Sequence, residues 1–445
     1  MIEAQLPPDW RELADQMRLI REHPSHMNTK IKDVRDLLRV VLHYVSGSSL
    51  RMTAALAAAS GIVVLTSVAL HKWMKKLGPY LAALLQKMVG CDAFLPEHWG
   101  GLQIIVGDAT TVQRPGSKGT TARVHYALRL CNLSARHIEV TDDKGGETAR
   151  RFRAEPGELW VFDRIYANPP GIASIHGRGA HTIVRYNRGA LPLYDEHKKR
   201  LDVDALLRQT CTRGQAYQHP AYVQGPDGVI CGRLCWLHLP EDKAREARKR
   251  LQRETEGNCD ADALYAAEFV VLFTTTTDQQ LSAELVLQVY RARWQIELKF
   301  KRSKSIEELD KLPNFLPETI YSWICAKLLL QQIAYRMATS AVASPPQASA
   351  AAPLPSSPAT PPIPPTPPSE PSREPVVAEP WYVTRLVWRT VCNALLPISL
   401  HDIPKVLTGF VDHIRQANER ARRPRQIDTL RKKFGLPRIW EPVFG

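Results

Sequence analysis

Residues 102–108 read LQIIVGD, a short apolar run that ends in an acid, and residues 159–163, LWVFD, repeat this pattern. Short apolar runs bounded by turn residues predict buried strands. A strand that stops at a carboxylate presents it at the edge of the sheet, where ligands commonly bind. Asp108 and Asp163 are therefore candidate site residues, although either acid alone is also an ordinary start of a turn.

Further strand-like segments surround these two, with one helix-sized interval among them. The strand-like segments are VHYALRL at 124–130, HIEVTD at 137–142 and HTIVRYN at 181–187, and the interval is GIASIHGRG at 171–179. This order of elements predicts an α/β fold in which helices cover a mixed sheet.

The regular succession of short strands is interrupted between about residues 191 and 269, which indicates an inserted, β-rich subdomain. Two strand-like pieces precede a charged helix and a final strand: AYVQ at 221–224, GVICGRLCWLHL at 228–239, EDKAREARKRLQRETE at 241–256 and EFVVLFTTTT at 268–277. A long helix from about Ala283 to Ser303 follows, with Asp278 or Ser282 as its N-cap.

Helical sequence precedes the sheet. RMTAALAAASG at 51–61 and TSVALHKWMKKL at 66–77 predict two short helices joined around Gly61. They form either a helix-turn-helix or an ordinary bundle with a solvated basic face. The second helix carries the basic residues His71, Lys72, Lys75 and Lys76.

The C-terminal part of the chain differs in composition. Residues 341–378 are mostly Pro, Ala and Ser, which predicts a disordered or extended linker because such a segment buries little apolar surface. Helical sequence returns at 381–396, WYVTRLVWRTVCNALL, and a basic tail follows at 415–434. The tail either adds affinity for DNA or is a solvated charge run.

Composition narrows the class of partner. The 445 residues carry a formal net charge of +14, which points to a polyanion, either nucleic acid or an anionic membrane surface. No apolar stretch is long enough for a spanning helix, and the N-terminus lacks the features of a signal peptide. The eight cysteines are scattered, and Cys231, Cys235 and His238 lack the spacing of a common zinc finger. The scattered cysteines favour the reducing cytoplasm, and charge alone does not choose between the two polyanions.

A third acid lies on the predicted long helix. Glu297 shares one stripe of that helix with Tyr290, Arg293 and Lys304, because at about 100° per residue the four side chains fall within roughly 60° of one another. An ordinary helix surface with i,i+4 ion pairs such as Arg293–Glu297 explains the same pattern. The neighbouring Trp294 is interpreted as a packing residue.

The stripe also carries a family resemblance. Residues 290–304, YRARWQIELKFKRSK, contain Y-x2-R-x3-E-x6-K and resemble in full the signature of the IS4-type transposases. GDATTVQRPG at 107–116 and DRIYANPPG at 163–171 resemble the segments around that family's two Asp residues. The resemblance covers roughly residues 30–335. It departs at Ala109, where Ser or Gly is more usual, and in the Pro-rich linker.

The resemblance implies a fold and a site. The fold is an RNase H-like catalytic core with a β-rich insertion, between a helical N-terminal domain and a helical C-terminal region. Asp108, Asp163 and Glu297 would be catalytic and would bind two Mg²⁺ ions, with Mn²⁺ as a substitute, because hard oxygen ligands suit Mg²⁺.

Other residues would hold DNA. Tyr290, Arg293 and Lys304 would bind the transposon-end strand, and Arg185 and Arg164 are weaker candidates for contacts to the backbone. Excision through a hairpin would require an aromatic side chain to receive a flipped base. Trp236 would serve, unless it is a core tryptophan.

By the same resemblance, the predicted function is that of a cut-and-paste DNA transposase of the bacterial cytoplasm, associated with the nucleoid and with no membrane partner. It would bind its terminal inverted repeats and target DNA as a homodimer in a paired-end complex. Two alternatives stay open: a catalytically idle DNA-binding regulator, and a nuclease on the same core that does not join strands. The expected domains are a helical DNA-binding domain (1–100), the first part of the core (101–190), the β-rich insertion (191–269), the second part of the core (270–340), the linker (341–380) and the helical C-terminal region (381–445).

Overall fold

The computed structural model describes most of the chain as far as the linker. The described residues are 2–20, 31–59, 62–90, 101–210, 212–313, 316–343, 380–395 and 433. Gly61, the linker between 344 and 379, and most of the C-terminal region, including the basic tail, lie outside them. Within the described ranges, no helix has the length and apolarity needed to cross a membrane.

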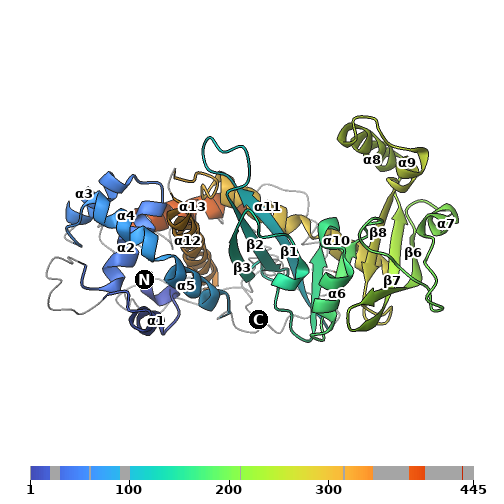
Figure 1. The fold of residues 1–445 in the computed structure, drawn as a ribbon, viewed down its shortest axis with the longest axis horizontal. Helices are drawn as coiled ribbons and strands as arrows, with labels where there is room; N and C mark the ends of the chain where they lie inside the picture. The colour runs from blue at the N-terminus through green and yellow to red at the C-terminus, as the bar shows by residue number, and fades with distance from the viewer. Residues whose placement is uncertain are drawn as a thin grey trace, which may run out of the picture.

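One sheet of eight strands organises the described chain (Figure 1). Its spatial order is β3-β2-β1-β4-β5-β8-β7-β6. The strands are β1 (Gln103–Val112), β2 (Ala122–Arg129), β3 (Ala135–Asp142), β4 (Glu158–Phe162), β5 (His181–Arg185), β6 (Ala216–Gly225), β7 (Gly228–His238) and β8 (Phe269–Thr274). Strands β4 and β5 run parallel to β1, and every other pairing is antiparallel. The predicted mixed sheet is confirmed, and β6 and β7 of the insertion extend it through β8.

The expected end of the first strand at Asp108 is wrong. Strand β1 continues to Val112, because its antiparallel pairing with β2 includes Asp108 opposite Tyr126. Only the parallel pairing with β4 stops earlier, at Val106. Asp108 therefore lies inside a strand, at the point where one of its two neighbours ends.

The central strands are buried on both faces, as parallel strands usually are. On β4, Leu159 and Val161 enter one core cluster, whereas Trp160 and Phe162 enter the other. The first core contains the helices α10 (Ala283–Arg291) and α11 (Trp294–Ser305) together with the N-terminal helices, and the second contains α6 (Pro169–His176). Residues two apart on a strand share a face, so this alternation fixes which side of the sheet each later residue faces.

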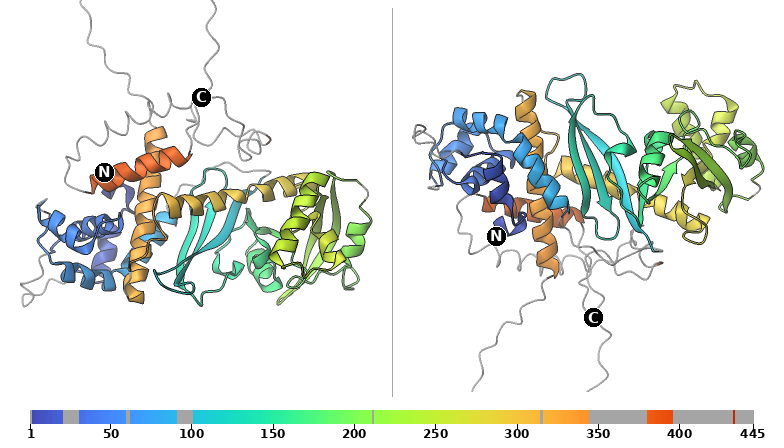
Figure 2. Two further views of the ribbon diagram at one scale, coloured as in Figure 1. Left: turned by 90° about the horizontal axis from the view of Figure 1, so that it is seen from above. Right: turned by 60° about the horizontal axis from the view of Figure 1, so that its bottom comes forward.

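The N-terminal helices pack around one long helix, α12 (Pro317–Ala343), and the last of them also contacts strand β3 directly (Figures 1 and 2). They are α1 (Trp10–Gln16), α2 (Val34–Val45), α3 (Leu50–Ala59), α4 (Ser67–Lys76) and α5 (Gly78–Gly90). The two predicted short helices are confirmed as α3 and α4. Lys72, Lys75 and Lys76 are exposed on α4, but His71 is half-buried and lies 3.5 Å from the Thr319 hydroxyl on α12. Helix α13 (Pro380–Ala394) packs against α12.

The insertion carries three helices, α7 (Val203–Arg208), α8 (Glu241–Glu254) and α9 (Ala261–Ala266). A buried acid, Glu268, anchors α8 to the sheet. Its carboxylate accepts hydrogen bonds from Arg213 (2.7 Å), from His238 (3.0 Å) and from Arg248 on α8. Burial alone would raise the pKa of Glu268, but these three donors outweigh it and lower the pKa to about 2.

We expect Glu268→Gln to lower the free energy of unfolding by about 1–3 kcal/mol at pH 7, because it removes the charged acceptor of three hydrogen bonds while two of the donors, Arg213 and Arg248, stay about one third exposed to water. The folded-state pKa lies below the unfolded one, so the carboxylate stabilises the fold above about pH 4.5 and loses this effect as the pH falls toward 2. Urea denaturation at pH 7 and pH 3 measures this, and the difference between variant and wild type should shrink at pH 3. An equal difference at both pH values would contradict the assignment.

Candidate active site

The two aspartates stand on neighbouring strands. The parallel register of β1 and β4 pairs Val106 with Val161, so Asp108 within β1 and Asp163, the residue directly after β4, each lie two residues beyond this pair. Val106 and Val161 both belong to the core that contains α10 and α11. By the alternation of side chains along a strand, the two aspartates face the same side of the sheet. Both are half-buried.

The helix that carries the third acid is interrupted. Ser282 caps α10 by accepting a hydrogen bond from the Leu285 amide, as one of the two predicted caps. The single long helix predicted from Ala283 to Ser303 is wrong, because α10 ends at Arg291 and α11 begins at Trp294. Around the break, Arg293 and Ile296 donate their amides to carbonyls three residues back, at 3.0 and 3.1 Å. A tight turn of this kind inside a helix often occurs at a functional site.

Arg293 joins the strands to the helix. Its guanidinium lies 3.3 Å from the Asp108 carboxylate and 2.5 Å from the Glu297 carboxylate. The Tyr290 hydroxyl donates to the Asp163 carboxylate at 3.4 Å, and the Arg293 guanidinium lies 5.9 Å from the Tyr290 ring centre. The structure thus brings together five residues that the sequence predicted to belong to one site.

The site holds an excess of negative charge away from water. The pKa of Asp108 is raised to about 7, chiefly by burial; the Ala109 amide and Arg293 act to lower it, and the charge of Asp163 adds a smaller increase. Burial also raises the pKa of Tyr290, together with the charge of Asp163. The ionised Asp108 is therefore costly without a nearby cation, and Arg293 is the cation that contacts it here.

The other predicted residues lie farther out. Lys304 lies two turns beyond Glu297 on α11 and is half-buried, and burial lowers its pKa while Asp310 opposes this. Arg164 follows Asp163 in the short 3-10 helix Arg164–Tyr166 and is exposed. Arg185 is exposed at the end of β5, where the register of β4 and β5 places it beside Asp163.

The structure distinguishes the two tryptophans. Trp236 is 5% exposed, donates its indole N–H to the Thr210 hydroxyl at 2.8 Å and stacks on Tyr217. This geometry favours the core alternative for Trp236. Trp294, interpreted as a packing residue, is 47% exposed, with the Lys301 ammonium 4.7 Å from its ring. That interpretation is wrong, because the break before α11 turns the indole away from the core.

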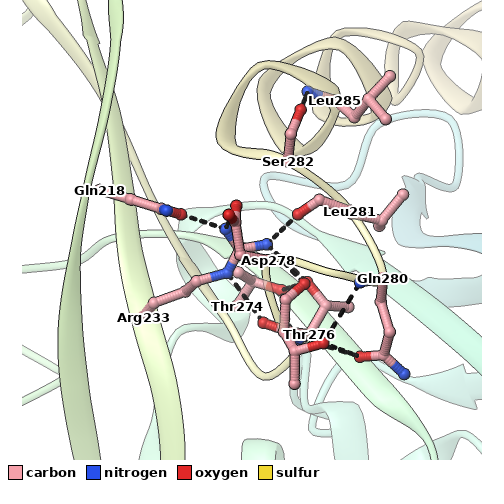
Figure 3. A network of polar contacts seen from close by, with 10 residues as sticks. Gln218, Arg233, Thr274, Thr276, Asp278, Gln280, Leu281, Ser282 and Leu285 are labelled. Carbon is pink, nitrogen blue, oxygen red and sulfur yellow. Dashed lines mark hydrogen bonds and ion pairs between the residues drawn. The ribbon is translucent and has the colours of Figure 1, made fainter.

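Sequence reasoning missed Arg233. This buried residue of β7 directs its guanidinium at the loop that leads into α10 (Figure 3). It donates to the carbonyls of Thr276 (2.9 Å) and Thr277 (3.0 Å), to the Asp278 carboxylate (3.1 Å) and to the carbonyl of Leu281; the Gln218 side chain accepts another of its hydrogen bonds. The insertion therefore holds the start of the helix that carries Tyr290. An Arg inside a strand otherwise made for burial was the available sequence signal.

We expect Arg233→Met to destabilise the protein by about 2–4 kcal/mol, because it leaves the carbonyls of the buried Thr276 and Leu281 without this donor. Thermal denaturation measures the loss, and hydrogen exchange should accelerate in residues 276–293. As a control, Asp278→Asn removes an acid whose side chain is 59% exposed and should change stability by less than about 1 kcal/mol. Unchanged exchange at the start of α10 in the Met variant would contradict this role.

These observations define a class of protein. A mixed sheet with acids on two neighbouring strands and a third acid on the helix that covers them is the RNase H-like arrangement of enzymes that cleave and join phosphodiester bonds. Residues 99–313 match the family described as Transposase DDE domain.

Curated relatives agree with this class. The chain is similar to the transposase for insertion sequence element IS421 of Escherichia coli, with 31% identity over 317 residues. The matched region spans 67% of this chain and 84% of that protein. The putative transposase InsL for insertion sequence element IS186A of Escherichia coli strain K12 is also 31% identical, over 316 residues. This match likewise covers 67% of this chain and 84% of that protein. The transposase for insertion sequence element IS231E of Bacillus thuringiensis subsp. finitimus is 25% identical over 242 residues, 48% of this chain and 50% of that protein. The chain belongs to the DDE transposases of insertion sequences, and the predicted resemblance to the IS4 type is confirmed.

Proposed function

We propose that this transposase excises its own insertion sequence and inserts it elsewhere, with Asp108, Asp163 and Glu297 as its catalytic acids. The observation that carries the proposal is the convergence of these acids, from β1, from the end of β4 and from α11, on a single guanidinium and a single phenol. An ordinary helix surface would explain the pair of Arg293 and Glu297, but not the contact of Arg293 with an acid 185 residues away.

The DDE family generally uses divalent metal ions, and the residues present fit two Mg²⁺ ions, with Mn²⁺ as a substitute. The donor set is carboxylate oxygen, which Mg²⁺ prefers, and the buried Asp108 favours a neighbouring cation. Among the residues that the structure describes, no three His, Cys, Asp or Glu side chains already form a metal cluster. In this structure the guanidinium of Arg293 compensates the acids that the ions would bind.

Asp108, Asp163 and Glu297 would hold the ions. When bound, two such ions activate an attacking oxygen and stabilise a leaving one at a phosphodiester. Arg293, once released from its two acids, can bind phosphate oxygens in bidentate fashion, and the Tyr290 hydroxyl can donate to the same strand. Lys304, Arg185 and Arg164 would contact the backbone on either side of this phosphate.

DNA recognition would involve the rest of the chain. The proposed substrates are the terminal inverted repeats and a target duplex, bound by a homodimer that pairs the two ends. The exposed lysines of α4 support a role of the N-terminal helices in this binding. If excision proceeds through a hairpin, the exposed Trp294 offers a surface on which a flipped base can stack, whereas the buried Trp236 does not.

We expect Asp108→Asn, Asp163→Asn and Glu297→Gln each to abolish Mg²⁺-dependent cleavage of labelled DNA that carries the element's flanking repeat. Binding of the same DNA should stay within a few-fold of wild type, because the neutral amides keep the shape of the site. Gel analysis of cleavage beside a binding titration measures both. Cleavage retained by any of the three variants would contradict the assignment.

The products distinguish the alternatives. Joined products with a target duplex support the transposase, cleavage without joining supports a nuclease on the same core, and binding without cleavage by the wild type supports a regulator. The intact set of three acids disfavours the regulator, because a protein that only binds DNA has no use for them.

Metal binding can be tested without activity. We expect Mg²⁺ or Mn²⁺ to raise the melting temperature of the wild type, since a ligand at a hundred times its Kd stabilises the folded state by about 2.7 kcal/mol. Asp108→Asn should remove most of this shift. Asp143→Asn, at an exposed acid on the β3–β4 connection, is the matched control and should keep it. Equal shifts in the two variants would contradict the proposed metal site.

A further inference from the structure

Helix α8 of the insertion stands on the same edge of the sheet as Asp163. It connects β7 to β8, and β8 runs antiparallel to β5 with Leu272 opposite Arg185, the residue at which β5 ends. The pair of His238 and Phe269, between which α8 is inserted, therefore lies beyond that end.

Glu297 and Asp163 are close enough to raise the pKa of the Arg250 guanidinium, after the larger effect of its ion pair with Glu254. Arg185 similarly contributes to a lowered pKa of Glu254, after Arg250. The pairing of β8 with β5 and these electrostatic contributions agree in placing α8 on the edge of the sheet where β5 ends and Asp163 lies.

The cations on the C-terminal half of α8 have few acidic partners within the protein. Lys249, Arg250 and Arg253 are all exposed. Within the described part of the chain, no acid lies within ion-pair distance of Lys249 or Arg253, and the Nε of Arg253 donates only to the Lys249 carbonyl, at 3.3 Å. Arg250 pairs with Glu254 at 2.7 Å, but the two side chains are 74% and 58% exposed. Such an exposed pair contributes little and yields readily to a phosphate.

The opposite side of α8 is fixed in place. Ala244 is fully buried, and Arg248 bonds to Glu241 at 3.2 Å and to the buried Glu268. The helix thus uses one arginine for its attachment and leaves a basic face at a set position next to the acids. A solvated charge run has no reason to be held there, whereas a surface for DNA does.

We propose that the basic face formed by Lys249, Arg250 and Arg253 binds backbone phosphates of the DNA duplex beside the scissile phosphodiester. The proposal rests on the proposed function, because it extends the DNA path from the acids onto the insertion. The partner is identified by its chemistry: a rigid row of exposed cations next to a phosphoryl-transfer site matches the regular negative charge of a duplex. Base sequence would not matter for these contacts.

The test compares the triple variant Lys249→Gln, Arg250→Gln, Arg253→Gln with wild type at several salt concentrations. Three lost phosphate contacts should reduce the slope of log affinity against log salt by about 2.7, so that the affinity advantage of the wild type falls by roughly 40-fold between 50 and 200 mM salt. The probes are a labelled duplex of the element's flanking repeat and a duplex of scrambled sequence, and both should show the change.

The matched control removes three charges elsewhere in the insertion, by Lys198→Gln, Lys199→Gln and Arg200→Gln. These exposed residues lie in a segment that pairs through Tyr194 with β6, the edge strand farthest from β1 and β4 along the sheet on that side. The control should keep the wild-type slope. Equal melting temperatures of the three proteins exclude misfolding as the cause.

The outcomes separate the two proposals. A wild-type slope in the α8 variant overturns the role of α8, whether or not the wild type cleaves. Absence of cleavage by the wild type, with an altered slope in the α8 variant, overturns the proposed function but supports α8 as a DNA surface. Cleavage of the end duplex and joining of pre-cut ends to a target, measured separately, show which duplex α8 holds, because only the reaction that uses it should slow.

Discussion

The gathering of three half-buried carboxylates around one guanidinium and one phenol is the constraint on which this site depends. Asp108 and Asp163 are brought to one side of the sheet by the parallel pairing of β1 and β4, and Glu297 approaches from α11. Gathering such charges away from water is unfavourable unless cations accompany them. Arg293 contacts two of the three acids, and the tight turn between α10 and α11 sets its position.

Several features outside the acids serve this arrangement. Arg233 on β7 fixes the loop before α10, so the insertion is mechanically connected to the helix that carries Tyr290. Glu268 fixes α8 against the same sheet. A β-rich insertion between the second and third acids is therefore more than an appended unit, because its strands continue the catalytic sheet and its buried charges position elements around the site.

Arg293 also suggests how the site is protected before it binds ions and DNA. Its guanidinium satisfies acids that would otherwise repel one another, and the same group is suited to phosphate oxygens once the ions compensate the acids. One side chain thus has two sets of partners with the same chemistry. The exposed Trp294 directly after it, and the basic face of α8 nearby, extend the site outward along the path we propose for DNA.

The sequence by itself determined the nature and the order of the parts. Strand-like runs predicted each strand of the sheet, and the spacing of Tyr290, Arg293 and Glu297 placed them on one stripe, since such patterns are local and depend on period alone. That this stripe belongs to a site was implied by its resemblance to the IS4-type signature. Only the tertiary structure decided that β1 continues past Asp108, that the helix breaks before Trp294, and that Arg233 reaches the loop at 276–281. The β1–β2 pairing and the Arg233 hydrogen bonds join residues far apart in the chain, and the break places Arg293 where it contacts Asp108 on β1. Tertiary contacts of this kind override local propensity, which is a weak preference by itself.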